Sequence, residues 1–418
     1  MYKPIEKFSM GVGDRFGLEG EAQLEALVQA RRQGISVVPV WNKSFREHEI
    51  TGTQPASVRE EADAAVNALS WESSYYVDAD HISLSNVDSF IENADFFTLD
   101  VADFIGEDCG DDEKEKFVEE NKKHIGTFNI PGIEDSLTLS EDNLRDFASQ
   151  YLRAIQEAGR LYRYIVKNRG DDSFVTEVSM DETDTSQKPM DIFLCLLALS
   201  SEGVPAQTIA PKFSGEFHKG VDYVGDVNCF EEEFRQDVAI TRFAIGYCDL
   251  PETLKVSMHS GSDKFSLYPV MRNILKEFDA GVHLKTAGTT WLEEIGGLAS
   301  AGGEALDFAK RLYREALTRY DELCAPYASV LDINKEKLPP AEDVEGWTSG
   351  DFVGALEHNP ECNDYNPDFR QLLHVAYKLA AEAGEEFRST VRQSEDAVHQ
   401  KVRDNLLERH IKPLFPED

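Results

Sequence analysis

One repeated pattern restricts what this chain can fold into: a short apolar run ends abruptly in polar residues, and an amphipathic segment follows. Residues 75–82, Tyr-Tyr-Val-Asp-Ala-Asp-His-Ile, are the clearest example, because two acids and a histidine close the run. Comparable runs begin near residues 7, 35, 96, 174, 206, 255 and 282, which gives eight strand candidates. Strands that alternate with helices form a parallel sheet covered on both faces. The pattern therefore predicts an α/β fold, and a closed (β/α)₈ TIM barrel is its natural form.

The segments between these runs carry apolar residues at helical spacing. They span about residues 18–32, 57–69, 144–166, 191–200, 230–245, 268–277 and 303–317. A spacing of three and four indicates helices that bury one face. Residues 105–139 differ, because acids, glycine and Pro131 interrupt the pattern, and we interpret them as an inserted loop or lid.

The last part of the chain lacks the strand pattern. We expect residues 1–338 to form the barrel and residues 339–418 to form a helical C-terminal extension, with helical spacing at 369–384 and 387–409. This extension would pack on the barrel or on another subunit, so a homo-oligomer is possible. Residues 330–333 could add one strand to the count.

The charge balance limits the partners. The 42 basic and 78 acidic residues give a net charge of −36, which disfavours nucleic acid and anionic membranes and means that an anionic substrate needs a local cationic pocket. No window approaches ~18 consecutive apolar residues, and the N-terminus lacks the apolar core of a signal peptide, so we expect a cytoplasmic protein. The six cysteines show no Cys-x-x-Cys spacing and are expected to be free thiols.

Three histidines and one carboxylate belong to the predicted strands or their ends. His81, His259 and His283 lie at or near strand ends, and Glu177 belongs to another strand. In a barrel the carboxyl ends of all strands meet at one mouth, so these residues could bind one divalent cation through nitrogen and oxygen ligands. Zinc, manganese, nickel and cobalt suit such a site.

Acids at the strand ends are candidates for proton transfer. Asp80 precedes His81 and would lie beside a metal ligand as a general acid/base if both share the frayed strand end. Asp181 and Glu182 form a second acidic strand end, which equally fits a helix N-cap.

Cations near the same ends would form a positive mouth. Asn42 and Lys43 follow one predicted strand, in a cluster that is either this mouth or a solvated loop. Lys212, Lys264 and Lys285 would add positive charge for an anionic substrate.

Long motifs in the chain resemble the tagaturonate epimerase family of bacterial hexuronate catabolism, nearly end to end. They are Gly-Val-Gly-Asp-Arg-Phe (11–16), Pro-Val-Trp-Asn-Lys-Ser (39–44), Val-Asp-Ala-Asp-His-Ile (77–82), Thr-Glu-Val-Ser-Met-Asp-Glu (176–182), Gln-Thr-Ile-Ala-Pro-Lys-Phe (207–213), Lys-Gly-Val-Asp-Tyr-Val-Gly-Asp (219–226), His-Ser-Gly-Ser-Asp-Lys-Phe-Ser (259–266), Lys-Thr-Ala-Gly-Thr-Thr-Trp-Leu-Glu-Glu (285–294) and Tyr-Asn-Pro-Asp-Phe-Arg-Gln-Leu-Leu-His (365–374). Asp78, Gln207 and Asp263 lie in these motifs and join the expected substrate-binding residues.

The Asp-His pair and the later His-Ser-Gly-Ser turn are also similar to class II, metal-dependent aldolases, a more distant resemblance. It implies an acid/base role for Asp80 and metal ligation by His81 and His259. The third aldolase histidine has no clean counterpart, so Glu177 and His283 are alternative further ligands.

The family resemblance implies an isomerase that interconverts D-tagaturonate and D-fructuronate, which differ at the carbon β to the ketone. Enolisation cannot invert that carbon, because the ketone does not acidify its proton. Retro-aldol cleavage, rotation of the aldehyde fragment and recondensation would invert it, with Asp80 and Glu182 moving the hydroxyl proton on opposite faces. Oxidation and re-reduction by a nicotinamide is the other route, but Phe16 replaces the third glycine of the dinucleotide fingerprint, so we expect none.

Three other functions use the same residues. They are a ketohexose 4-epimerase for tagatose and fructose, an aldolase-type lyase, and a sugar-acid sensor without catalysis. A lyase would release three-carbon products that can be trapped, and a sensor would bind its ligand without turnover.

Overall fold

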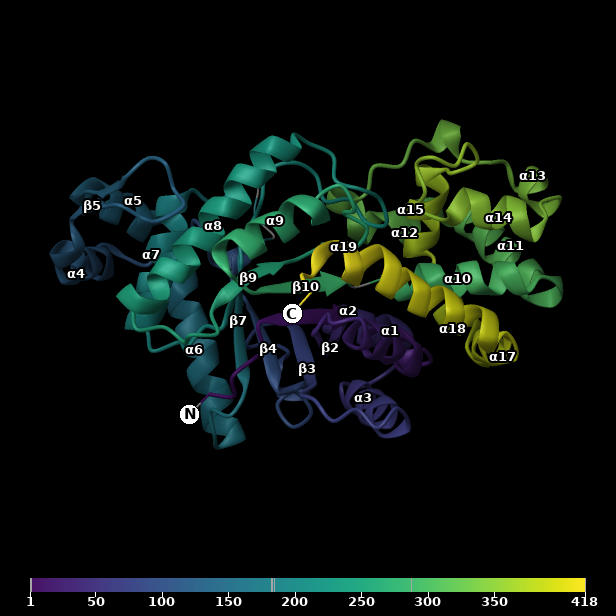
Figure 1. The fold of residues 1–418 in the computed structure, drawn as a ribbon, viewed down its shortest axis with the longest axis horizontal. Helices are drawn as coiled ribbons and strands as arrows, with labels where there is room; N and C mark the ends of the chain where they lie inside the picture. Colours follow the sequence, from purple (N-terminus) through teal and green to yellow (C-terminus); the bar gives the residue numbers. More distant parts are fainter. Residues whose placement is uncertain (1, 182, 184, 287, 418) are drawn as a thin grey trace.

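The protein is a closed barrel of eight parallel strands surrounded by helices (Figure 1). The computed structural model describes residues 2–181, 183, 185–286 and 288–417. Around the barrel the strands follow the order β1-β10-β9-β8-β7-β4-β3-β2. Their bounds are β1 (Phe8–Val12), β2 (Val38–Ser44), β3 (Tyr76–Ile82), β4 (Phe96–Asp100), β7 (Val175–Ser179), β8 (Thr208–Ala210), β9 (Lys255–Met258) and β10 (Val282–Thr286). The predicted TIM barrel is confirmed.

Helices cover the outside of the strands, because alternate strand residues point outward and are apolar. Those up to the end of the barrel strands are α1 (Gly20–Arg32), α2 (Phe45–Thr51), α3 (Ala56–Ala68), α4 (Asp111–Asn121), α5 (Glu141–Gln150), α6 (Leu152–Arg169), α7 (Pro189–Ser201), α8 (Val227–Tyr247) and α9 (Tyr268–Phe278). The single helix expected over residues 144–166 is two helices, α5 and α6, which meet at Tyr151. Only a short 3₁₀ turn, Val87–Ser89, lies between β3 and β4.

The interior of the barrel has an apolar layer towards the amino ends of the strands and a polar layer towards their carboxyl ends. Val40, Tyr76 and Phe96 belong to a small buried cluster that fills the lower part. Further along the same strands, the inward side chains become polar, as at Asp78 on β3 and Thr98 on β4. Apolar side chains close one end of the barrel, and titratable groups collect towards the carboxyl ends of the strands.

Residues 105–139, expected to be a loop or lid, contain regular structure. Helix α4 packs against α5, and a small antiparallel hairpin joins β5 (Gly126–Phe128) to β6 (Leu137–Leu139). Figure 1 shows α4, α5 and β5 together at one edge of the molecule. Phe117 and Val118 are the buried apolar residues of α4, and they are too few to produce a clear helical pattern among its acids.

The chain after the last barrel strand is helical, and this includes residues 339–418, for which helices were predicted. Its helices are α10 (Thr289–Ala301), α11 (Gly303–Thr318), α12 (Tyr320–Cys324), α13 (Ala341–Glu345), α14 (Ser349–Leu356), α15 (Pro367–Val375), α16 (Tyr377–Ala383), α17 (Glu385–Gln393), α18 (Glu395–Asp404), a π-helix (Asn405–Ile411) and α19 (Lys412–Leu414). The extra strand considered at residues 330–333 is not formed, and Val330 instead ends a 3₁₀ segment. Helix α10 was not predicted, because no helix was assigned between the strand near residue 282 and the helix expected over residues 303–317.

The chain end returns to the barrel wall. Helix α18 packs against α1 and α10, and α19 packs against α9 (Figure 1). These last helices therefore pack on the helices that flank β1 and β10 in the chain, and these two strands pair where the barrel closes. The division of the chain at residue 338 stays a prediction.

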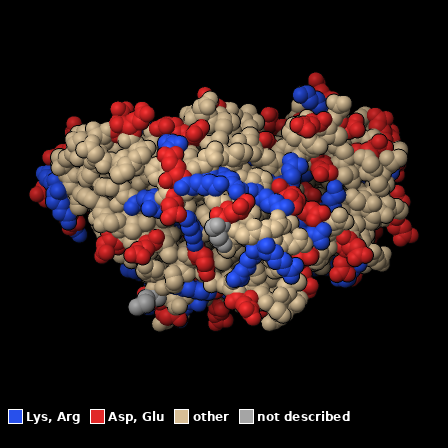
Figure 2. All heavy atoms as spheres, in the orientation of Figure 1, with Lys and Arg blue, Asp and Glu red and all other residues tan. Residues whose placement is uncertain are grey.

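Charged side chains are scattered between uncharged areas on the face shown in Figure 2, where several Lys and Arg side chains lie near the centre with Asp and Glu around them. On this face the acidic side chains are scattered and do not form a single patch. Among the described residues, no helix is long and apolar enough to span a membrane.

Candidate active site

The carboxyl ends of the strands open into a cavity of about 700 Å³. Its floor is formed by Asp80, Lys285 and His259, and its rim by side chains from the loops after β2 and β8. Tyr327 and His374, which follow the barrel strands in sequence, complete one wall. The C-terminal helices therefore contribute directly to the cavity.

Two histidines and one aspartate meet at this floor. His81, Asp181 and His259 each place one ligand atom within 4.8 Å of the others. Asp181 Oδ1 lies 3.0 Å from His259 Nδ1 and 3.7 Å from His81 Nε2. Two imidazoles and a carboxylate are the donor set of many divalent metal sites in enzymes, so these three residues fit a divalent cation.

The end of β3 is shaped so that two neighbouring side chains face the cavity. In a regular strand Asp80 and His81 would point to opposite faces. The pairing of β3 with β4 shifts register between Ala79 and Ile82, and His81 adopts a left-handed φ of 52°. A bulge of this kind redirects a side chain, at a cost of about 1–3 kcal/mol for a residue other than glycine. Asp80 and His81 were predicted to face the mouth together, and this bulge explains why both do so.

A buried ammonium lies beneath the histidines. Lys285 Nζ is 2.9 Å from Asp78 Oδ2, 2.8 Å from Asp80 Oδ1 and 2.9 Å from Glu177 Oε1. Burial alone lowers the pKa of Lys285, but the three carboxylates outweigh it and raise that pKa well above its usual value. Burial raises the pKa of Asp80, but Lys285 and His81 outweigh it, so the pKa of Asp80 is lowered and its carboxylate is ionised. Burial dominates at Asp78, whose pKa rises to about 7 despite Lys285.

Glu177 supports the histidine group from below. Its Oε1 lies 2.7 Å from His259 Nε2, and its Oε2 accepts a hydrogen bond of 2.7 Å from Thr208 Oγ1. A carboxylate on the second nitrogen of a ligating imidazole fixes the orientation of the ring. Glu177 is therefore placed to orient His259, whereas Asp181 is the carboxylate that lies with His81 and His259.

His283 lies one layer deeper in the barrel, outside the group formed by His81, Asp181 and His259. Its Nδ1 is 2.9 Å from Ser9 Oγ, and its ring packs against Phe96 with centroids 5.2 Å apart. Burial lowers the pKa of His283 to about 3, so the imidazole is neutral. The reason is its position two residues before Lys285 on β10, which places it below the mouth.

Comparison with known proteins identifies the family. The chain matches the family model described as tagaturonate epimerase over residues 3–414. The chain belongs to the tagaturonate epimerase family. It is similar to the tagaturonate/fructuronate epimerase of Thermotoga maritima, with 30% identity over 431 residues that cover 99% of this chain and 82% of that protein. The family resemblance of the sequence motifs is thereby confirmed.

Solved structures of the family share the fold. The glycerol-complexed crystal structure of the fructuronate-tagaturonate epimerase UxaE from Cohnella laeviribosi superposes with a TM-score of 0.81 at 25% identity and covers 99% of this chain and 83% of that one. The native crystal structure of the same enzyme gives a TM-score of 0.79, also at 25% identity, with 97% and 81% covered.

In this member of the tagaturonate epimerase family, three predicted substrate-binding residues lie away from the cavity. Gln207 precedes β8 at the opposite end of the barrel, where its amide bonds the backbone of Lys3 and Ile5. Asp263 forms a fully buried ion pair with Arg370 Nη2 at 3.1 Å, which ties the C-terminal helices to the barrel. Lys43 points out of β2, where its ammonium donates to Thr53 Oγ1 at 2.9 Å and to the carbonyl of Arg15.

The other predicted residues lie at or near the cavity. Asn42 and Lys212 line it directly, and Lys285 forms part of its floor with Asp78 beneath. Lys264 also lines it, but its ammonium donates to the carbonyl groups of His218, Val221 and Ser262 at 2.7–3.1 Å. Glu182, predicted as the second acid/base, lies outside the described residues.

Several residues of the site were not predicted. Asp181 had been noted only as a strand end or helix cap, although its place two residues after the buried strand β7 was a signal that it could reach the mouth. Arg15 lines the cavity and is held by Glu47 Oε1 at 2.9 Å and by the ring of Tyr377, whose centroid is 3.9 Å away. His374 comes from α15, and no feature of its local sequence indicates the cavity.

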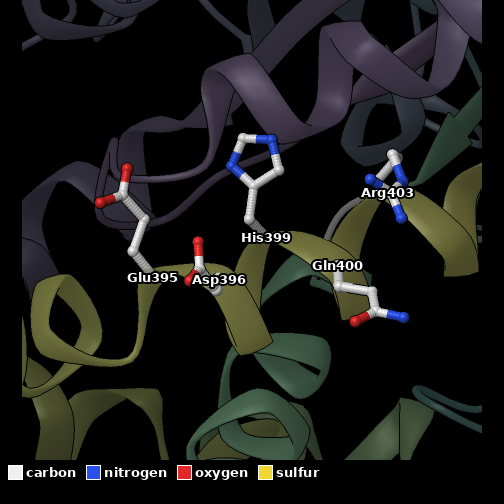
Figure 3. A pocket seen from close by; sticks show the side chains of 5 residues that line it. All are labelled: Glu395, Asp396, His399, Gln400 and Arg403. Carbon is white, nitrogen blue, oxygen red and sulfur yellow. The ribbon is translucent and has the colours of Figure 1, made fainter.

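A second, smaller hollow of about 350 Å³ lies along α18, far in sequence from the barrel mouth. Figure 3 shows its side chains, Glu395, Asp396, His399, Gln400 and Arg403, on one stretch of helix. His399 Nε2 and Arg403 Nη1 lie 3.2 Å and 3.7 Å from Glu25 Oε2 of α1. These pairs attach α18 to the barrel, which accounts for the polar character of the hollow.

Proposed function

We propose that the protein interconverts D-tagaturonate and D-fructuronate by inverting the carbon β to the ketone, in the cavity above Lys285. The observation that carries the proposal is the placement of an ionised Asp80 beside the group formed by His81, Asp181 and His259. Membership of the tagaturonate epimerase family supplies the substrate class. The name of the Thermotoga maritima relative states the same pair of sugar acids.

His81, Asp181 and His259 would hold one divalent cation. When bound, such an ion supplies Lewis acidity that polarises the ketone of the substrate. Glu177 keeps the ring of His259 in place through its contact with Nε2. The site is compatible with zinc, manganese, nickel or cobalt.

Asp80 has the properties of the base that starts a retro-aldol cleavage. Its carboxylate is ionised, and its Oδ1 is held at 2.8 Å by both His81 Nδ1 and Lys285 Nζ. It would remove the proton from the hydroxyl on the β carbon, so that this carbon becomes an aldehyde, the bond between the α and β carbons breaks, and the electron pair passes into an enediolate. Rotation of the aldehyde and re-formation of the bond return the proton to the inverted alcohol. Glu182 stays the predicted partner on the other face.

Lys212 is the best candidate to hold the substrate carboxylate. Among the three lysines predicted for this role, Lys285 is surrounded by carboxylates and Lys264 by carbonyl groups. Lys212 also lines the cavity, and its backbone N–H is fixed by Gln187 Oε1 at 2.7 Å. A cation at this rim favours a uronate over a neutral ketohexose in a protein with so negative a surface.

The first test is turnover of tagaturonate by the purified protein with individual divalent ions, with and without chelator, and with tagatose as the neutral control. We expect fructuronate only when the chelator is absent. Metal analysis of His81→Ala and His259→Ala should show less bound ion than the wild type. Unchanged metal content in both variants would remove the assignment of these ligands.

An isotope experiment tests the route. In retro-aldol inversion the hydrogen on the inverted carbon never leaves it, so substrate deuterated there should give product that keeps the label. Solvent deuterium at that carbon would show direct deprotonation instead. A hydride route would also keep the label, so the protein must be shown to carry no nicotinamide. Released three-carbon products would indicate a lyase.

A further inference from the structure

One ammonium connects parts of the site that perform different tasks. Lys285 Nζ contacts Asp78, Asp80 and Glu177 at 2.8–2.9 Å and donates to Thr98 Oγ1 at 2.6 Å. The side chain is 4% exposed although it belongs to the floor of the cavity. A lysine ammonium has three N–H donors, and four acceptors already surround this one.

The surroundings of Lys285 fix the two groups nearest the chemistry. Asp80 Oδ1 lies between Lys285 Nζ and His81 Nδ1, each at 2.8 Å. Glu177 Oε1 lies between Lys285 Nζ at 2.9 Å and His259 Nε2 at 2.7 Å. The position of the base and the orientation of one histidine thus depend on the same ammonium.

The packing around β10 is adapted to this lysine. Gly11 on the neighbouring strand β1 faces it, and a Cβ at Gly11 would lie 3.2 Å from Lys285 Cα. On the other side, Thr98 Oγ1 is 2.9 Å from Asp78 Oδ1, so its hydroxyl bridges the ammonium and a carboxylate that Lys285 also contacts directly. The contacts come from strands β3, β4 and β7, which surround the lysine across the barrel.

We propose that Lys285 is a positioning residue, which fixes Asp80 directly and His259 through Glu177, and that it does not bind the substrate carboxylate. The inference rests on the proposed function for the roles of Asp80 and His259. Its donors are saturated inside the barrel, so a carboxylate in the cavity has no free N–H of Lys285 to accept. A positioning role predicts that loss of Lys285 lowers kcat, whereas loss of a carboxylate ligand raises KM.

The test compares Lys285→Met with the double variant Lys285→Met/Asp78→Asn, which also replaces one of the carboxyl groups that Lys285 contacts. Lys255→Met is the matched control, because Lys255 is another buried barrel lysine but donates to the backbone of Glu6 near the start of β1. We expect Lys285→Met to lower kcat at least ~10²-fold, with KM within threefold of the wild type. The double variant should recover thermal stability but not kcat, a separation that a merely structural role would not give. Lys255→Met should keep kcat.

Metal affinity gives a readout that does not depend on turnover. Zn²⁺ and Mn²⁺ are titrated into each variant against a chromophoric chelator, and loss of Lys285 should weaken binding about 10–100-fold through the freed Glu177–His259 pair. If the wild type fails to epimerise tagaturonate, this titration still tests whether Lys285 positions His259 through Glu177. A tenfold rise in KM with kcat retained, or unchanged kcat and metal affinity in a folded variant, would overturn the proposal.

Discussion

Glu19 allows a quantitative prediction, because it is a buried acid outside the cavity. It is 2% exposed and lies at the start of α1, next to the turn that the Asp14 carboxylate organises by accepting four backbone N–H groups. Burial first, and then the charges of Asp14 and Glu395, raise the pKa of Glu19 to about 9 from its ordinary 4.5. The folded protein therefore holds this proton over a pH range in which the unfolded chain has released it.

The sign of the effect follows from the proton count. Between about pH 4.5 and pH 9 the folded state binds more protons than the unfolded state, so the free energy of unfolding falls as the pH rises. The stabilisation is complete below pH 4.5 and is lost by about pH 9. One pKa unit corresponds to about 1.4 kcal/mol, so up to about 5 kcal/mol would be lost by pH 8. Hydration of the ionised group by local opening makes this an upper limit.

The variant Glu19→Gln isolates this contribution, because the amide keeps the shape of the side chain and does not titrate. Urea unfolding of the wild type and the variant is measured at unit steps from pH 5 to pH 8. The difference in unfolding free energy should grow in favour of Glu19→Gln by up to about 1.4 kcal/mol per pH unit. Glu21→Gln changes an exposed side chain of the same helix and serves as the control. Parallel pH profiles for wild type and Glu19→Gln would refute the reasoning.

Three further variants test the site and its frame. Asp80→Asn should lower epimerisation at least ~10²-fold while the melting temperature stays near that of the wild type, because the amide keeps the shape but cannot accept the hydroxyl proton; activity above a tenth of wild type contradicts this role. His283→Leu should keep the bound metal, because His283 contacts Ser9 below the mouth, and metal analysis of the variant measures this. A loss of metal equal to that of His81→Ala would show that His283 is a ligand. Arg370→Met should lower the unfolding free energy by about 3–5 kcal/mol in urea titrations, because it leaves the carboxylate of Asp263 buried without its partner; a change below about 1 kcal/mol would show that the pair contributes little.

The strand ends could be read from the sequence, because local patterns determine them. Apolar residues followed by Asp80 and His81 mark a buried strand that reaches the mouth, and the barrel geometry of parallel strands then brings His259 to the same place. The same logic covered Asn42 and Lys212. Polar residues that lie at the end of a single strand could therefore be predicted from the sequence.

The depth of each side chain in the barrel was decided only by the tertiary structure. His283 and Lys285 share one face of β10, but two residues along a strand move a side chain by about 7 Å, so one lies in the lower layer and the other reaches the floor of the cavity. Gln207 was displaced to the far end for a related reason, because it precedes its strand. A sequence motif therefore identifies such residues but does not show how deep in the barrel their side chains lie.

Closure of the barrel created the remaining contacts. Lys285 is 205 residues from Asp80 in the chain, and it meets that carboxylate only because β10 pairs with β1 and completes the ring. His374 reaches the cavity on α15, a helix whose position depends on buried contacts such as the pair of Arg370 with Asp263. The local sequence determines which residues lie at the end of a strand. Which charged side chains meet in the low-dielectric interior depends on how the strands pair to close the barrel.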